Sequence, residues 1–251
     1  MESSSLVILA AEEQVQLDRS LTLLGDSIEL LAEVERFYDS LPESHSFQSP
    51  LSHEDGVRLY MLLVCRRHLT VGMLTMVRGY HADSQRHLRE AIECLAFAIC
   101  ISDEPALGQL WADATKGGAE WKAYRKAFGR AVETAKSRLK ELYGVHDDCS
   151  KASHPSIQTV GRYMRTGNSL TELPIQWADM MNERLLLLVF FNNVLLYFRI
   201  VEAFALLFRD AAKPDSQWDA QIAAFLGKLA VYQDRASGQI AAMKESDHWI
   251  R

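Results

Sequence analysis

Residues 185–208 read LLLLVFFNNVLLYFRIVEAFALLF, a long and largely apolar run. By length alone this run is sufficient to span a bilayer as a helix. It contains Asn192, Asn193, Arg199 and Glu202, and an arginine at the centre of a membrane helix costs roughly 2.5–3.5 kcal/mol. Arg199 and Glu202 are three residues apart, which places them side by side on a helix where they can form an ion pair. We therefore predict a buried central helix of a water-soluble bundle, with no membrane partner.

Outward from this run, apolar residues recur at spacings of three and four along most of the chain, and Gly and Pro are few. This periodicity predicts an all-α, multi-helix bundle. We expect one domain, made of an N-terminal helix within residues 1–45, a core within 54–212 and a C-terminal helix within 215–248. The core of the bundle should form where the run at 185–208 meets the apolar face of residues 88–99.

The expected helix boundaries follow from Gly and Pro. The N-terminal helix should run from about 6 to 41 and end before Pro42, and the next should begin near 54 and break near Gly79. A short helix should open at Pro105, a long charged helix should cover 118–143, and a helix should resume near 176 and run to 212. Between them, TVGRYMRTGNSLTEL (159–173) has a turn signal and no helical stripe, which predicts a small loop or hairpin near 157–175.

The formal net charge of −6 argues against a protein whose whole surface binds phosphate backbones. The charge is uneven, however, with a balance of −10 over residues 1–55 and +6 over residues 116–140. We favour the interpretation that the acidic N-terminal helix docks on the basic segment and neutralises it. The alternative is a nucleic-acid patch, because a charge run is either solvated, paired internally or offered to a partner.

The four cysteines show no CxxC spacing, and three of them fall within apolar helical patterns. We therefore expect reduced, buried thiols. The N-terminus, MESSSLVILAAEEQ, has no basic region before its short apolar run, so it does not resemble a signal peptide. A cytoplasmic protein is the expectation.

The stretch DDCSKASHPS, residues 147–156, places His154 directly before a proline. Proline disfavours the helical conformation for the residue before it, so His154 should lie where the preceding helix ends. Carbonyls at a helix C-terminus stabilise a cation, which raises the pKa of a histidine there and suits it to act as an acid or base near neutral pH. The other interpretation is that the ring only caps the helix.

Two chemical interpretations of the neighbouring residues fail on helical geometry. In a continuous helix Asp147 lies about 10 Å along the axis from His154 with Ser150 between them, whereas a hydrolase triad needs histidine in the middle. His146 and His154 lie about 12 Å apart and are rotated by roughly 80°, too far to share one zinc ion with Cys149. We therefore expect no metal site, and no cofactor is indicated.

Arg86 and Glu90, and likewise Arg89 and Glu93, are four residues apart beside the apolar stripe of their helix. This spacing predicts two ion pairs on the helix surface. The pairs either form a solvated edge, or one arginine and one glutamate turn inward and orient the region around His154.

Two stretches, RHLREAIECLAFAI (86–99) and YGVHDDCSKASHPS (143–156), resemble a family of uncharacterised bacterial helical proteins. The pattern of that family is an Arg-to-Glu helix, a downstream tryptophan and a Tyr…Ser-x-x-x-His element. The family is related to the HEPN superfamily of helical domains, many of which are RNA-cleaving toxins or defence factors. The similarity covers about residues 58–156. On this resemblance, the pattern falls on Arg89 and Glu93 (or Arg86 and Glu90), Trp111, Tyr143, Ser150 and His154.

The chain departs from the active HEPN ribonucleases at one point. Those enzymes look like an arginine and a later histidine with four to six residues between them, where arginine stabilises phosphate charge and histidine moves the proton. Counting back from His154, the arginine positions hold Cys149, Asp148 and Asp147, and the two carboxylates would repel a phosphate. An arginine from another segment, such as Arg162, would have to supply the charge.

Two functions follow from these residues. We favour a non-catalytic interaction or ligand-binding protein on a HEPN-like scaffold, in bacterial stress or defence. The alternative is a metal-free ribonuclease or phosphodiesterase that uses His154. The resemblance and the apolar surface of residues 185–208 also imply a homodimer, while the net charge does not favour RNA as a partner. The predicted catalytic residues are His154, Ser150, Arg89 and Glu93, and the predicted ligand-binding residues are Tyr143, Arg86, Glu90 and Arg162.

Overall fold

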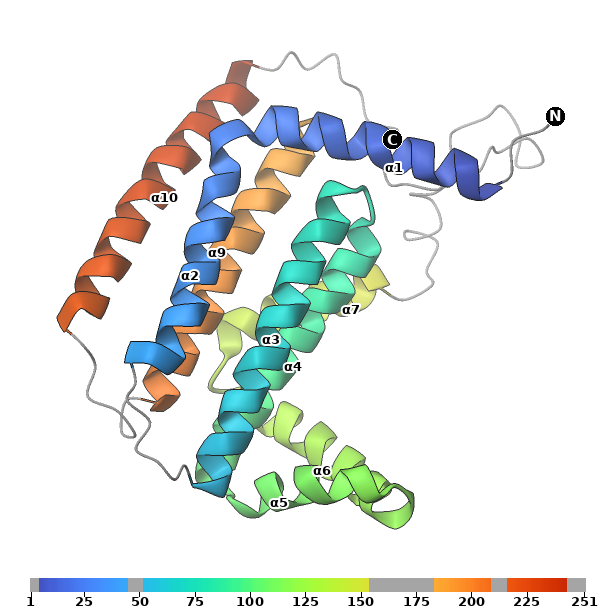
Figure 1. Ribbon diagram of the computed structural model, residues 1–251, viewed down its shortest axis with the longest axis vertical. Helices are drawn as coiled ribbons and strands as arrows, with labels where there is room; N and C mark the ends of the chain where they lie inside the picture. The colour runs from blue at the N-terminus through green and yellow to red at the C-terminus, as the bar shows by residue number, and fades with distance from the viewer. Residues whose placement is uncertain (1–4, 45–51, 154–182, 209–215, 243–251) are drawn as a thin grey trace.

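The structure is a computed structural model that describes residues 5–44, 52–153, 183–208 and 216–242 (Figure 1). Within those ranges the chain is helical and contains no strand, which confirms the all-α multi-helix bundle. The predicted loop or hairpin near 157–175 lies outside the described residues. The helices are α1 (Ser5–Leu24), α2 (Glu29–Ser44), α3 (His53–Val77), α4 (His81–Asp103), α5 (Ala106–Asp113), α6 (Gly118–Ala135), α7 (Lys140–Ser153), α9 (Glu183–Phe208) and α10 (Ser216–Ala242).

Helices α3 and α4 form an antiparallel hairpin whose turn is made by Gly79. The N–H of Gly79 donates to the carbonyl of Met76 at 3.0 Å, and the N–H of Tyr80 donates to the carbonyl of Thr75 at 2.8 Å. Gly79 has φ of +90°, a conformation that a side chain would strain. This is the Schellman arrangement that ends a helix and reverses the chain. The predicted break near Gly79 is confirmed.

The N-terminal segment is two helices, where the sequence predicted one from 6 to 41. A 3₁₀ turn at Gly25–Ile28 separates α1 from α2, and Gly25 has φ of +46°. Glycine in a helix interior costs about 1 kcal/mol relative to alanine, so a break is inexpensive there. As a result α1 crosses the ends of the other helices, whereas α2 runs beside α9 (Figure 1). The predicted end before Pro42 is also wrong, because α2 continues to Ser44.

The predicted charged helix at 118–143 is likewise two helices. The turn over residues 136–139 ends α6, and α7 begins at Lys140. Leu139 and Tyr143 are buried, so the turn directs the apolar side chains of α7 onto α4. Helices α5 and α6 lie at the end of the α3–α4 hairpin that is opposite α1 (Figure 1). The residues around His146 therefore belong to a separate helix, α7, which packs on α4.

Helix α9 occupies the centre of the bundle and contacts α1, α2, α3, α4 and α10. Buried apolar side chains occur along the whole helix, from Leu186 to Phe208. Leu88, Ile92 and Leu95 of α4 are also buried, so the predicted core of residues 88–99 and 185–208 is confirmed. Burying this much apolar area is the main stabilising contribution to the fold.

One helix of the described residues, over Leu186–Phe208, is long and apolar enough to cross a membrane, and 56% of that window is buried inside the protein. Arg199 and Glu202 form the predicted ion pair at 2.8 Å. Two apolar side chains of α9 are exposed, Leu188 and Leu206, at 45% and 61%. Most of the apolar surface that suggested a homodimer is therefore covered by the helices of the same chain.

Candidate functional site

Helix α4 carries four of the predicted site residues, which make contacts in two directions. Glu93 contacts α7, whereas Glu90 contacts α3. The predicted pair of Arg89 and Glu93 is confirmed, with Arg89 Nε 3.5 Å from Glu93 Oε1. The predicted pair of Arg86 and Glu90 is wrong. Arg86 instead lies 3.5 Å from Asp83, and Glu90 turns toward α3. Helical spacing permits either pairing, and the neighbouring helix decides between them.

His146 of α7 completes the cluster around Glu93. Its Nε2 lies 3.1 Å from Glu93 Oε1, and its Nδ1 lies 3.4 Å from Asp147. The ring lies against Tyr143 at a tilt of 39°, with centroids 5.0 Å apart, and the side chain is only 12% exposed. Glu93 is thus held between Arg89 and His146. His146 was considered in the sequence only as a metal ligand, and its role beside Glu93 was missed.

Tyr143, a predicted ligand-binding residue, and its neighbour Cys149 have structural roles on α7. The hydroxyl of Tyr143 donates to the carbonyl of Val132 at 2.6 Å, and burial raises the pKa of Tyr143 well above its ordinary value. The thiol of Cys149 donates to Gln85 at 2.8 Å, and burial raises its pKa to about 12. A protonated, buried thiol is a poor nucleophile and a poor metal ligand.

Ser150 lies half-buried on α7. His154 and Arg162 lie outside the described residues. Arg89 contacts Glu93, and its charge also lowers the pKa of Cys149 against the larger effect of burial. The predicted Arg–Glu pair therefore faces the same helix that leads to His154.

An open groove borders Glu93 on the side of α6, and we call it the aromatic groove. It measures about 430 Å³. Trp121, Tyr124 and Phe128 have successive ring centroids 5.5 and 5.7 Å apart, because spacings of three and four align them on one helix face. Phe128 packs on Phe97 of α4 at 5.2 Å. The groove is lined by Glu93, Trp121, Tyr124, Arg125, Phe128, Gly129 and Val132.

Trp121 is the most exposed of these three rings. Trp121 is 48% exposed, whereas Tyr124 and Phe128 are half-buried. Burial raises the pKa of Tyr124 to about 12, so its phenol is neutral at physiological pH. A large aromatic ring left this open is a common anchor for a ligand, because covering it removes apolar area from water.

Three cations of α6 are exposed, namely Arg125, which lines the groove, and Lys122 and Lys126, which lie on the same helix. None of them lies within ion-pair distance of a carboxylate in the part of the chain that the structure describes. Other cations of the same basic segment are paired, Arg130 with Glu104 at 3.3 Å and Arg138 with Asp103 at 2.6 Å. Within the described residues, these three cations of α6 are therefore open to solvent or to a ligand.

The favoured interpretation of the basic segment is wrong, since the acidic N-terminal helices do not neutralise it. Their carboxylates pair with cations elsewhere in the bundle. Helices α1 and α6 lie at opposite ends of the α3–α4 hairpin, and α2 runs beside α9 (Figure 1). The pairs are Asp39 with Arg66, Glu13 with Arg78, and Glu33 with Lys228.

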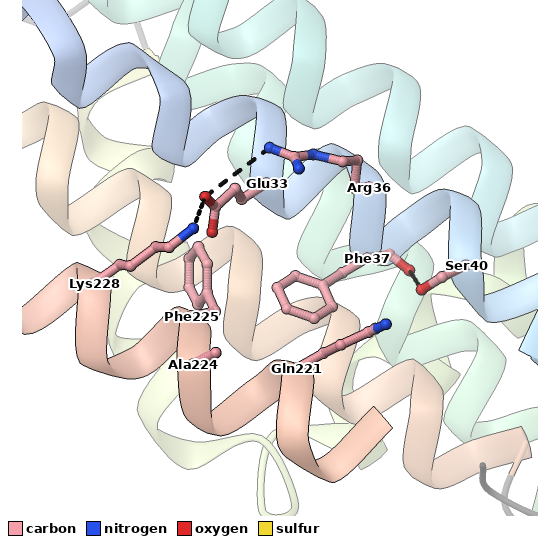
Figure 2. Close-up of a pocket in the computed structure, with 8 residues that line it drawn as sticks. All are labelled: Glu33, Arg36, Phe37, Ser40, Gln221, Ala224, Phe225 and Lys228. Atoms are coloured by element: carbon pink, nitrogen blue, oxygen red, sulfur yellow. Dashed lines mark hydrogen bonds and ion pairs between the residues drawn. The ribbon is translucent and has the colours of Figure 1, made fainter. Parts of the chain in front are cut away.

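A second pocket, of about 320 Å³, lies between α2 and α10. Figure 2 shows that the Glu33 carboxylate lies between Arg36 and Lys228, at 3.9 and 2.5 Å. Below them Phe225 packs against Phe37 with centroids 5.4 Å apart. The charges that line this pocket are satisfied by one another, and its aromatic rings are buried. It is a gap in a helix–helix contact.

The aromatic groove, with Glu93 at its edge, is therefore the candidate functional site. The sequence analysis missed it, although the signal is present in WKAYRKAFGR at 121–130, where aromatic and basic residues alternate with helical spacing. A comparison of the chain with known protein families, with curated proteins and with solved structures found no match.

Proposed function

We propose that the chain is a cytoplasmic, non-catalytic ligand-binding protein on a HEPN-like scaffold, and that the aromatic groove binds a nucleobase that carries phosphate. The observation that supports this most is the exposed Trp121 ring beside Arg125, on a helix whose cations Lys122, Arg125 and Lys126 have no carboxylate partner among the described residues. Stacking of a base on an aromatic side chain contributes about 1–3 kcal/mol by alanine substitution. The cations supply the electrostatic attraction for phosphate.

Glu93 gives this proposal its chemical selectivity. Its contacts with Arg89 and His146 both use Oε1, and Glu93 lines the groove, so we infer that Oε2 accepts a hydrogen bond from the ligand. A carboxylate accepts a hydrogen bond from the exocyclic amino group of cytosine, and an adenine amino group has the same donor chemistry. Uracil has a carbonyl at that position and would face the carboxylate without a donor. We therefore expect adenine or cytosine to bind more tightly than uracil.

The ligand chemistry has two sources, a free nucleotide and single-stranded RNA, and one experiment separates them. Fluorescence anisotropy would be measured with labelled short oligoribonucleotides of A, C and U, and competed with AMP, CMP and UMP. Displacement by low concentrations of a mononucleotide indicates a nucleotide site. Displacement by RNA alone indicates that several phosphates are needed along α6.

Trp121→Ala is the decisive variant, because it removes the stacking surface from an exposed position. We expect it to weaken binding about 5–150-fold, whereas Trp121→Phe should retain most of the affinity. Tyr60→Ala is the matched control, since Tyr60 is 49% exposed on α3. Absence of binding to every RNA and nucleotide would reject the proposal, and equal binding by Trp121→Ala would move the site to another surface.

The ribonuclease alternative is tested with the same RNA. Cleavage that disappears in His154→Ala would replace the non-catalytic proposal by an enzymatic one. The homodimer that the resemblance implies is a separate proposal, and sedimentation equilibrium at high micromolar concentration tests it. A monomer under those conditions would reject a stable pair without affecting the aromatic groove, which is formed within one chain.

A further inference from the structure

The α3–α4 hairpin brings together two histidines and a glutamate on the outer face of the bundle. His68 of α3 and His87 of α4 are placed opposite each other by the turn at Gly79, and Glu90 follows His87 by one helical turn. His68 Nδ1 lies 3.1 Å from His87 Nδ1 and 3.1 Å from Glu90 Oε2. The three atoms all lie within 4.8 Å of one another, and each residue is half-buried.

Hydrogen bonds alone do not satisfy all three side chains of this cluster. A neutral imidazole carries at most one proton on Nδ1, and His68 Nδ1 faces both a second imidazole nitrogen and a carboxylate oxygen. If its proton is donated to Glu90, no proton remains for His87. If His87 donates instead, the bare nitrogen of His68 faces the carboxylate lone pairs. A single cation placed between the three atoms would satisfy all of them at once.

The distances suit a metal ion. Zinc–nitrogen bonds of about 2.0–2.1 Å at tetrahedral angles place two ligand atoms about 3.3 Å apart. His68 Nδ1 lies 3.1 Å from His87 Nδ1 and 3.1 Å from Glu90 Oε2, and both separations are close to that value. Two imidazoles and one carboxylate are also a donor set that zinc and similar divalent transition metals accept.

We propose that His68, His87 and Glu90 bind one divalent transition-metal ion of the zinc class, with a fourth position open to water or a ligand. The side chains of His68 and Glu90 are 23% and 35% exposed, so solvent can reach that fourth position. This site differs from the set His146, Cys149 and His154 that the sequence analysis rejected. It goes beyond the proposed function and does not depend on it, because the three ligands lie between α3 and α4.

The test uses the full chain after treatment with a chelator. Zn²⁺ would be titrated by calorimetry, and Co²⁺ would be titrated by absorption spectroscopy, which reports the coordination number. We expect one equivalent of either ion and a four-coordinate Co²⁺ spectrum. His68→Ala and His87→Ala should each abolish the binding, and Glu90→Gln should weaken it at least about tenfold, since even an outer partner of a metal ligand contributes 10–100-fold.

Two histidine variants serve as controls. His53→Ala removes an exposed imidazole at the start of α3, and His146→Ala removes the imidazole beside Glu93; both should keep one equivalent. Circular dichroism would establish that each variant is folded, and Glu90→Gln, which keeps the shape of the side chain, carries the test if a histidine variant does not fold. No saturable binding by the unaltered chain would overturn the proposal. Binding that survives loss of both histidines, or that disappears in His146→Ala, would also overturn it.

Discussion

The aromatic groove between α4 and α6 and the pocket between α2 and α10 are built from the same kinds of residue. Each has aromatic rings, a glutamate and cations, and their volumes are about 430 and 320 Å³. They differ in whether their charged and aromatic side chains already have partners within the chain. In the α2–α10 pocket the carboxylate contacts both cations and Phe225 is 1% exposed. In the groove Trp121 is 48% exposed, and Arg125 has no carboxylate partner in the part of the chain that the structure describes. Composition therefore does not distinguish a structural contact from a binding surface, and pairing does.

The largest expected effect is on the structural side of this comparison. Phe225→Ala removes a buried ring that stacks on Phe198 at 4.6 Å, and loss of such a ring destabilises a protein by about 3–5 kcal/mol. Urea unfolding would measure the change. RNA affinity of the folded variant should stay the same. Val231→Ala on the same helix is the control, because Val231 is 61% exposed.

The second effect is on the binding side. Here the affinity should fall and the stability should stay nearly the same, which is the opposite of the result expected for Phe225→Ala. Trp121→Ala should lower the affinity for RNA or nucleotide by about 1–3 kcal/mol. It should change the free energy of unfolding by less than about 0.5 kcal/mol, as is usual for a surface substitution. Parallel anisotropy and urea titrations would check both values. A large loss of stability would show that Trp121 is a packing residue, and the contrast with Phe225 would fail.

The third effect concerns the unpaired cations. If Arg125 contacts a phosphate, Arg125→Ala should reduce the slope of log affinity against log salt by about 0.7, the value for a single-stranded contact. Lys228→Ala should leave that slope unchanged, since Lys228 lies in the α2–α10 pocket. Anisotropy titrations at several salt concentrations would measure it. An unchanged slope in Arg125→Ala would exclude this residue from phosphate contact.

The smallest effect is expected from the ion pair shown in Figure 2. Lys228 is 56% exposed and lies 2.5 Å from Glu33. Surface ion pairs contribute about 0–1 kcal/mol, so Lys228→Ala should change the free energy of unfolding within that range in urea. Arg36 remains near Glu33 in the variant. A loss of several kcal/mol would mean that the carboxylate is effectively buried and that the pair is part of the core.

Much of the fold could be predicted because it depends on local pattern. The helical period placed Leu88, Ile92 and Leu95 in the core, and glycine chemistry placed the turn at Gly79. The burial of all four cysteines is confirmed as well. The ion pairs that were predicted correctly, Arg89 with Glu93 and Arg199 with Glu202, lie within one helix. Neighbours of this kind are set by helix geometry.

The candidate site and the proposed metal site were harder to predict, because their contacts join distant segments. His146 and Glu93 are 53 residues apart, and His68 and His87 are 19 apart. The second pair was within reach of sequence reasoning, since residues 68 and 87 lie on the two arms of the predicted turn at Gly79, 11 and 8 residues from it. The first depends on the unpredicted turn that separates α7 from α6. His154 and Arg162 remain predictions, because they lie outside the described residues.

The sequence by itself determined the all-α class, the apolar central helix and the turn between α3 and α4, because the spacing of apolar residues and the backbone freedom of glycine act over a few residues. Only the tertiary structure decided which charges pair between helices. Glu90 turns to His68 instead of Arg86, and the N-terminal carboxylates pair far from α6. A charged side chain takes the partner that packing places within a few ångström, and this proximity is set by the whole bundle. The same packing leaves Trp121 and the cations beside it open to solvent.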